Sequence, residues 1–345
     1  MVLSKSLHAF STFNSARGLN AILCLVLLCV IFPSATIAQE DDDDVLRVNT
    51  ELLIFPIRIR NKNKQPVESL LENQLTVVDK DKVTTGLYLR RGVDRVALVF
   101  AVDQSGSTQQ IISQQRDTAL GLLNRFGPES QIALIRFTAT PKLVLNFSRD
   151  MTAARDAFNF SSAENQRTAL FDAADLAMRS FASLPKIRSE RRIVILISDG
   201  LDNASRAKPG DVIKAAIRDR VSFYVIHIPL FTPGDGRLIV RPPSSGFKDL
   251  AEKTGGKYFL ARDARSALAP DTNIDLAPMF KAIEDDLKSQ FLLGFYLSET
   301  ANDGKPHEFS MSMPTGYEYQ IIGRGFSRSQ KFFVANPREF LRRTQ

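Results

Sequence analysis

The residues with the clearest chemical potential are five oxygen-bearing side chains in three separate parts of the sequence. They are Asp103, Ser105, Ser107, Thr168 and Asp199. Carboxylate and hydroxyl oxygens are the ligands that a hard divalent cation such as Mg²⁺ prefers in proteins. The D-x-S-x-S sequence at 103–107 is weak evidence alone, because serine and aspartate before a helix also act as caps. The three segments together indicate a metal site, and helix capping is the alternative.

Two apolar runs are expected to bring the aspartates together. Val96–Val102 is apolar throughout and leads into Asp103, while Ile193–Ile197 leads into Ser198 and Asp199. Continuous apolar runs of this length are typical of strands buried on both faces of a parallel sheet. In an open α/β sheet, ligands bind at the carboxyl ends of the strands. We therefore expect both aspartates at the same sheet edge.

The region 93–290 alternates strand patterns with stretches of helical spacing. Helices are expected at Gln109–Phe126, Thr152–Phe158, Thr168–Phe181, Gly210–Arg218, Phe247–Lys253 and Leu276–Lys288. This alternation predicts an α/β fold with a doubly wound, mostly parallel sheet. The stretch Pro229–Ser245 is rich in proline and glycine, so we expect it to be a surface loop.

The three segments resemble the metal-ion-dependent adhesion site of von Willebrand factor A domains, which has D-x-S-x-S, a threonine and an aspartate in this order. The resemblance covers roughly 93–290. It implies that Ser105 and Ser107 bind the metal directly, that Thr168 binds directly or through water, and that Asp103 and Asp199 act mostly through water. The metal would be Mg²⁺, or Mn²⁺ or Ca²⁺.

A site of this kind has a consequence for its ligand. Because few carboxylates touch the cation, the cation stays under-neutralised, and an open coordination position favours an anionic oxygen. We therefore expect a protein partner with an exposed Asp or Glu. The sequence departs from the family at Gln166-Arg167, where small glycines are common. Arg167 can repel the cation, help to receive an anionic ligand or point to solvent.

Short strand patterns flank the α/β region at 39–92 and 291–345. A β segment of this size forms too little core to be stable alone. We expect the two segments to pack together as one small β-sandwich into which the α/β domain is inserted. The stretches 53–60 and 290–296 resemble the borders of exported von Willebrand factor A-related proteins of Acidobacteria.

The N-terminus is typical of a secretory signal peptide. Lys5 and Arg17 precede the apolar run Ala21–Phe32, and small residues follow up to Ala38. The run is shorter than the roughly 20 apolar residues that cross a membrane. We expect cleavage near Ala38, removing residues 1–38 and leaving a bacterial protein that is secreted, periplasmic or in the cell envelope, with no membrane span. An uncleaved anchor is the alternative.

Composition and motifs argue against two other function classes. The net charge is +7, but the basic residues are scattered among 38 acidic ones and do not interleave with aromatics, so nucleic acid is not an expected partner. No nucleophile elbow, phosphate-binding loop or zinc-ligand cluster is present. Of the three histidines, His8 lies in the signal, His227 lies in an apolar strand and is expected in the core, and His307 lies beside a turn.

These observations favour a non-catalytic binding protein rather than an enzyme. One alternative is a structural or assembly factor of the envelope, in which the metal only stabilises the fold. Another is a metal-dependent hydrolase that uses Asp103, Ser105 and Asp199.

Overall fold

The computed structural model describes residues 52–69, 74–79, 82–84, 87–93, 95–162, 167–185, 187, 190–234, 236–262, 274–296, 307–322 and 329–334. The chain divides into two units, residues 1–48 and 49–345, and the described residues all belong to the second. The expected signal peptide lies outside the described residues. Among these residues, no helix combines the length and apolar character that crossing a membrane requires.

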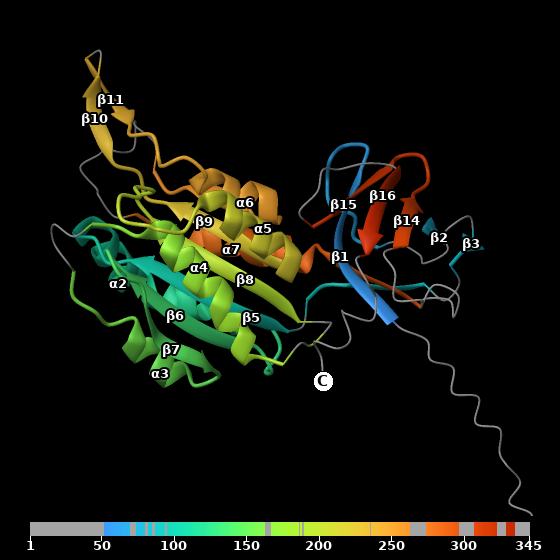
Figure 1. Cartoon of the computed structure of the whole chain (residues 1–345), viewed down its shortest axis with the longest axis horizontal. Coiled ribbons are helices and arrows are strands. Elements are labelled where there is room, and N and C mark those ends of the chain that lie inside the picture. The colour runs from blue at the N-terminus through green and yellow to red at the C-terminus, as the bar shows by residue number, and fades with distance from the viewer. Residues whose placement is uncertain are drawn as a thin grey trace, which may run out of the picture. The chain divides into compact units, whose positions relative to one another are not determined.

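A six-stranded sheet forms the centre of the α/β region (Figure 1). In spatial order its strands are β12 (Tyr258–Leu260), β9 (Val221–His227), β8 (Arg191–Ser198), β5 (Val96–Asp103), β6 (Gln131–Phe137) and β7 (Lys142–Ser148). All neighbours are parallel except β6 and β7, which form an antiparallel hairpin. The predicted doubly wound, mostly parallel sheet is confirmed.

Helices cover both faces of this sheet. One face carries α2 (Gly106–Leu123), α3 (Met151–Ala157) and α7 (Ala277–Lys288), and the other carries α4 (Leu170–Ser180), α5 (Pro209–Asp219) and α6 (Phe247–Thr254). Consecutive side chains of a strand point to opposite faces, so a strand between two helical layers must be apolar at every position. In β5, Phe100 joins the first apolar cluster, and its neighbours Val99 and Ala101 join the second.

The flanking segments form two four-stranded sheets, and each sheet contains strands of both segments. One has the order β15 (Tyr317–Ile321), β1 (Leu52–Asn61), β13 (Phe291–Tyr296) and β4 (Tyr88–Arg91), and the other has β16 (Ser329–Val334), β14 (His307–Ser312), β2 (Thr76–Asp79) and β3 (Lys82–Val83). Leu53 and Ile57 of the first segment share one apolar cluster with Phe295, Phe309 and Tyr319 of the second. Neither segment supplies all the strands of either sheet.

An ion pair joins β1 to α7. Arg58 contacts Asp286 through two hydrogen bonds, Nη2 to Oδ2 at 2.6 Å and Nε to Oδ1 at 3.1 Å. The Tyr224 hydroxyl also donates to Asp286 at 2.7 Å. Burial alone would raise the pKa of Asp286, but Arg58 and Lys257 bring it below its ordinary value. Asp286 therefore stays charged inside the protein because positive groups compensate it.

One expectation about the fold was wrong. The stretch Pro229–Ser245 is not an irregular loop, because it contains the two-stranded ribbon of β10 (Phe231–Gly234) and β11 (Arg237–Val240). Glycine, aspartate and glycine at 234–236 are a turn signal between two short apolar runs, which is the pattern of a hairpin. Pro233 obscured this pattern, because proline is confined to strands with an open edge. A ribbon of only two strands provides such an edge.

Candidate metal site

The candidate ligands lie on three segments at the carboxyl edge of the central sheet. Asp103 is the last residue of β5, and Asp199 directly follows β8, which pairs with β5 in parallel register. Ser105 immediately precedes α2, and Ser107 lies in the first turn of that helix. The Ser107 side chain lies outside the described part of the structure. Thr168 lies two residues before α4.

Asp103 is an almost fully buried carboxylate, 1% exposed. Its Oδ1 accepts a hydrogen bond from the Ser105 N–H at 3.0 Å, and its Oδ2 accepts one from the Ser198 hydroxyl at 2.9 Å. Burial and, to a smaller extent, the charge of nearby Asp199 raise the pKa of Asp103 to about 6, although the hydrogen bonds from Ser105 and Ser198 act in the opposite direction. Among the described residues no positive group compensates this buried charge, and a divalent cation would do so.

Asp199 is the second buried carboxylate of the site. Its Oδ1 accepts the Leu201 N–H at 2.9 Å. Its Oδ2 makes no hydrogen bond within the described residues. Burial raises the pKa of Asp199, while the hydrogen bond from Leu201 and the charge of Arg241 act in the opposite direction. Two buried, mutually repelling carboxylates at one sheet edge fit a cation site.

The glycine after Asp199 is required by the turn. Gly200 has a φ of +82°, which side chains rarely adopt. A Cβ at this position would also lie 2.7 Å from the Pro243 side chain and 2.9 Å from Phe247. The tight turn therefore holds the Asp199 segment against neighbouring residues.

The hydroxyls of the site are not used as helix caps. Ser105 is the N-cap of α2, but its side chain makes no capping hydrogen bond and instead donates to the Thr108 hydroxyl at 3.0 Å. A serine that donates its proton in this way keeps its lone pairs for a cation. The N-cap of α4 is Ala169, and the Leu170 N–H is satisfied by Asp202 Oδ1 at 2.9 Å. Helix capping therefore does not explain these two hydroxyls.

Thr168 is positioned by its backbone. Its N–H donates to Asn203 Oδ1 at 2.8 Å, and its carbonyl accepts the N–H groups of Asn203 and Ala204 at 3.0 and 3.1 Å. Within the described residues, the Thr168 hydroxyl has no hydrogen-bond partner. The three contacts join the Thr168 loop to the loop that follows Asp199, so they fix the two ligand segments relative to one another.

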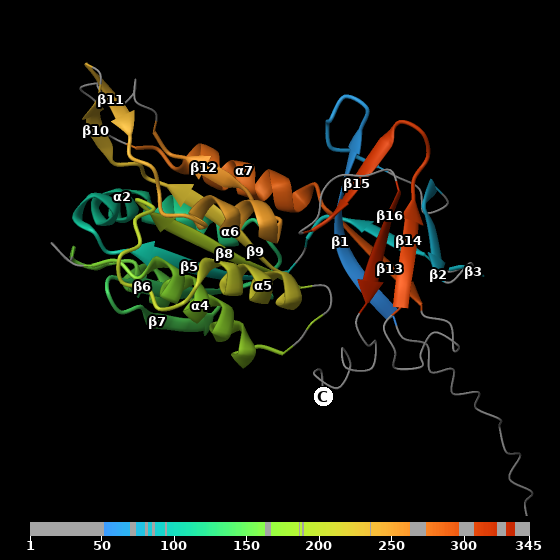
Figure 2. The same cartoon turned by 45° about the horizontal axis from the view of Figure 1, so that its top comes forward.

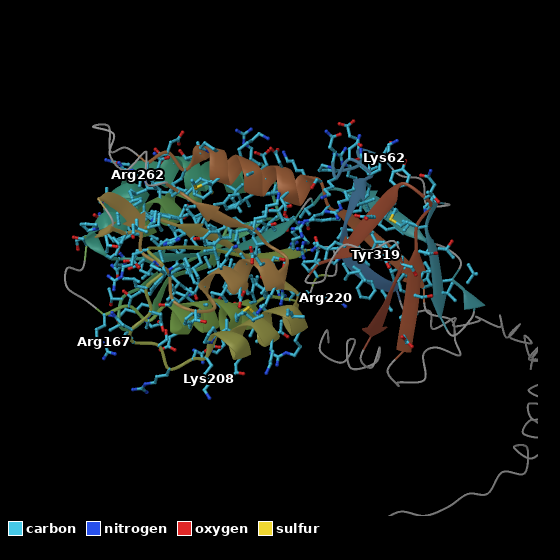
Figure 3. All side chains as sticks on the ribbon, turned by 90° about the horizontal axis from the view of Figure 1, so that it is seen from above. Lys62, Arg167, Lys208, Arg220, Arg262 and Tyr319 are labelled. Carbon is cyan, nitrogen blue, oxygen red and sulfur yellow. The ribbon has the colours of Figure 1, made fainter. Side chains whose placement is uncertain are left out.

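Arg167 lies at the rim of this arrangement. Both its Nε, at 3.1 Å, and its Nη2 donate to the Asn203 carbonyl. The side chain is exposed, and Figure 3 shows it at the surface of the α/β region. Its charge is therefore held close to the Thr168 loop but accessible to a ligand.

His227, the last residue of β9, contacts the backbone of Asp199. It is fully buried, as expected for a core histidine. Its Nε2 donates to the Asp199 carbonyl at 2.8 Å, and its Nδ1 contacts the Tyr258 hydroxyl. Burial lowers the pKa of His227, so the ring is neutral. The Nε2 tautomer follows from its partner, because a carbonyl can only accept.

Sequence reasoning missed several supporting residues. Thr108, Ser198, Asn203 and His227 orient the candidate ligands through hydrogen bonds, and only Thr108 is near its partner in sequence. A hydroxyl three residues after an N-cap serine was the available signal for Thr108. Nothing local linked Ser198 to Asp103, which lies 95 residues away.

The donor set differs from the usual protein metal cluster. Among the described residues, no group of three or more His, Cys, Asp or Glu is arranged to hold a metal. The candidate site has two carboxylates and three hydroxyls, so such a cluster is not expected here. Oxygen donors without nitrogen or sulfur suit Mg²⁺, Mn²⁺ or Ca²⁺.

Comparison with known families agrees with this arrangement. Residues 98–201 match the family model of the von Willebrand factor type A domain. The chain contains a von Willebrand factor A domain. The matched range begins in β5 and ends two residues after Asp199, so it includes all five candidate ligands. No curated protein sequence matches the chain.

Several solved structures are similar to the chain at low identity. The conserved hypothetical protein BatB from Bacteroides thetaiotaomicron shares 19% identity, with 56% of this chain and 97% of that chain covered and a TM-score of 0.39. An aerotolerance-related membrane protein from Bacteroides fragilis also shares 19%, covering 56% and 98%, with a TM-score of 0.38. Proximal thread matrix protein 1 of the mussel byssus, with a zinc-occupied adhesion-site motif, shares 15%, covering 62% and 50%, with a TM-score of 0.43.

Proposed function

We propose that the protein is an exported, non-catalytic binding protein whose von Willebrand factor A domain holds a divalent cation. Ser105, Ser107 and Thr168 would bind the cation through hydroxyl oxygens, and Asp103 and Asp199 would act mostly through water. The main support is the pair of buried carboxylates, both with a raised pKa, beside the Ser105 and Thr168 hydroxyls, which cap no helix. Mg²⁺, Mn²⁺ and Ca²⁺ all suit oxygen donors.

The ligand proposed for this site is an Asp or Glu of a protein partner. Neutral hydroxyls in direct contact leave most of the cation's charge uncompensated, so an open position attracts an anionic oxygen. Arg167 is exposed at the rim, and the exposed Arg241 acts electrostatically on Asp199. Positive charge around a cation site favours an acidic partner and speeds its approach.

The proposal does not include catalysis, because no nucleophile is paired with a base among the described residues of the site. The Ser105 hydroxyl donates to Thr108 rather than to a base. Both ring nitrogens of His227 are engaged inside the protein. General acid–base catalysis requires a base within hydrogen-bond reach of the reacting group, and His227 does not meet this requirement.

Partner capture with and without metal tests the proposal. The exported protein is used as bait in the native envelope fraction, in Mg²⁺ and in EDTA, beside Asp103→Ala and the control Asp211→Ala. Asp211 is an exposed carboxylate on α5. We expect Asp103→Ala and EDTA to abolish capture and the control to retain it.

A second measurement separates this proposal from a purely structural metal. Thermal unfolding is followed in the same buffers, and capture is measured well below the midpoint of unfolding. If EDTA lowers the melting temperature but leaves capture intact in the folded protein, the metal only stabilises the fold and the proposal is wrong.

A further inference from the structure

The ribbon β10–β11 is attached directly to the loop that carries Asp199. The Ser244 N–H donates to the Gly200 carbonyl, and the Ser244 hydroxyl accepts the Asp202 N–H, both at 2.8 Å. At the other end of the ribbon, the Ile228 N–H donates to the Ser198 carbonyl at 2.9 Å. Both ends are thus held at the candidate metal site. The ribbon extends away from the helices and the sheet (Figure 2).

One face of the ribbon carries only apolar side chains. Phe231 pairs with Val240 and Pro233 pairs with Leu238, and paired residues point to the same face. None of these four residues belongs to, or packs against, the three apolar clusters found among the described residues. The apolar face therefore contributes nothing to the hydrophobic core.

The opposite face is apolar in part. Ile239 is 41% exposed and lies over Gly234, where an added Cβ would meet its side chain. A two-stranded ribbon by itself is only marginally stable in water. A contiguous group of apolar side chains outside the core marks a contact site for another molecule more often than single scattered apolar residues do.

Charge at the base of the ribbon points to the kind of partner. Arg241 follows β11 directly, is exposed, and acts on Asp199 electrostatically. β10 carries no ionised residue, and β11 carries one, Arg237, which pairs with Gly234 and does not belong to the apolar pairs. A partner that follows the ribbon therefore meets positive charge near the metal and apolar side chains farther out.

We propose that β10–β11 is a second contact surface for the partner that binds the metal. Its occupant is a polypeptide segment in which an acidic residue is flanked on one side by apolar residues. The acidic residue meets the cation, and the apolar residues cover the face formed by Phe231, Pro233, Leu238 and Val240. This inference rests on the proposed function, because it places a carboxylate at the metal.

A displayed peptide library provides a defined probe. Each peptide carries a fixed Asp between five random residues on either side, and a second library has Asn in place of Asp. Both are selected on the exported protein in Mg²⁺. We expect enrichment from the Asp library, with apolar residues concentrated on one side of the Asp. The most enriched peptide is then synthesised and its affinity measured by fluorescence anisotropy.

Two ribbon variants and one control complete the experiment. Leu238→Ser combined with Val240→Ser changes the apolar face, and a short Gly-Ser linker in place of 231–240 removes the ribbon. The control is Ile217→Ser, which changes an exposed isoleucine on α5. We expect the peptide affinity to fall by about tenfold or more in both ribbon variants, as it does when a central apolar contact of an interface is lost. Mg²⁺ affinity should be unchanged in all three.

The outcomes separate this inference from the proposed function. Peptide binding that needs Mg²⁺ but is unchanged in both ribbon variants overturns the role of the ribbon and leaves the metal bridge. Binding that is weakened in the ribbon variants but unaffected by EDTA supports the ribbon and contradicts the metal bridge. Loss of Mg²⁺ affinity in the ribbon variants, or equal enrichment from both libraries without apolar preference, also overturns the inference.

Discussion

Replacing Asp103 with Asn removes the charge of this side chain and keeps its size. At pH 7 the carboxylate is ionised in the metal-free protein, because burial raises its pKa only to about 6 from 3.8. Keeping this charge out of water costs about 3 kcal/mol, at about 1.4 kcal/mol for each pH unit between the two values. The amide avoids this cost.

The hydrogen bonds of Asp103 are largely kept in Asp103→Asn. The amide oxygen accepts the Ser105 N–H, and the Ser198 hydroxyl turns to accept from the amide nitrogen, so about 1 kcal/mol is lost. We expect the metal-free variant to be more stable than the natural protein by about 2 kcal/mol at pH 7. The pKa of Asp103 is higher in the folded protein than in the unfolded chain. Its contribution to stability is therefore fully present below about pH 4 and is lost as the pH rises through about 6. The difference therefore shrinks as the pH is lowered toward about 4.

Metal brings the two proteins to nearly equal stability. A divalent ion and a unit charge about 4 Å apart attract by about 8 kcal/mol at an effective dielectric constant of about 20, before desolvation is subtracted. Even a quarter of this energy weakens binding about 30-fold. A Mg²⁺ concentration of about 100 times Kd stabilises the natural protein by about 2.7 kcal/mol. At about 30-fold weaker affinity the variant gains only about 0.9 kcal/mol, so Mg²⁺ cancels most of its advantage of about 2 kcal/mol.

Urea unfolding followed by circular dichroism, in EDTA and in Mg²⁺ at pH 7 and pH 4.5, measures these differences. Titration calorimetry measures Mg²⁺ binding directly, and Asp211→Asn is the exposed control. Lower stability of Asp103→Asn than of the natural protein in EDTA at pH 7, or an unchanged Mg²⁺ affinity, would contradict the predicted role of the Asp103 charge.

Three further predictions address the ligands, the protons and the fold. Thr168→Ala should weaken Mg²⁺ binding less than Asp103→Ala does, but it should weaken partner binding by more than its lower Mg²⁺ affinity explains. Calorimetry with metal and then with partner contradicts this if the two affinities fall by the same factor. Mg²⁺ affinity should fall by up to about tenfold per pH unit below about 6, because a proton competes for Asp103; a flat profile between pH 7 and 5 argues against Asp103 as a metal anchor. Arg58→Ala should destabilise the protein by about 3 kcal/mol, the lower end for a broken buried pair, since buried Asp286 keeps only Lys257 as a charged partner, whereas Arg60→Ala at a partly exposed pair should cost about 1 kcal/mol or less in urea unfolding.

Local sequence signals were sufficient for the α/β architecture. The apolar runs that became β5 and β8 are buried at every position, so their composition alone indicates strands between two helical layers. Because the carboxyl ends of parallel strands share an edge, the positions of Asp103 and Asp199 followed from the same signal. The D-x-S-x-S sequence and Thr168 completed a motif that can be read from residue types and order.

Tertiary structure decided how these residues are supported. Ser198 reaches Asp103, Asn203 holds Thr168, and His227 holds the Asp199 carbonyl, and each contact joins residues that are 28 to 95 positions apart. The spacing of apolar residues within one segment cannot predict a hydrogen bond between residues so far apart in the sequence. The pairing of β1 with β13 depends in the same way on a chain reversal across more than two hundred residues.

The ribbon β10–β11 shows the same limit on a smaller scale. Its turn residues were visible in the sequence, but Pro233 and the abundance of glycine in 229–245 favoured an irregular loop. Whether a short apolar run becomes a strand depends on the strand beside it, because backbone hydrogen bonds and cross-strand contacts stabilise both together. The sequence alone therefore identified the candidate cation ligands, and only the folded chain placed an apolar ribbon beside them.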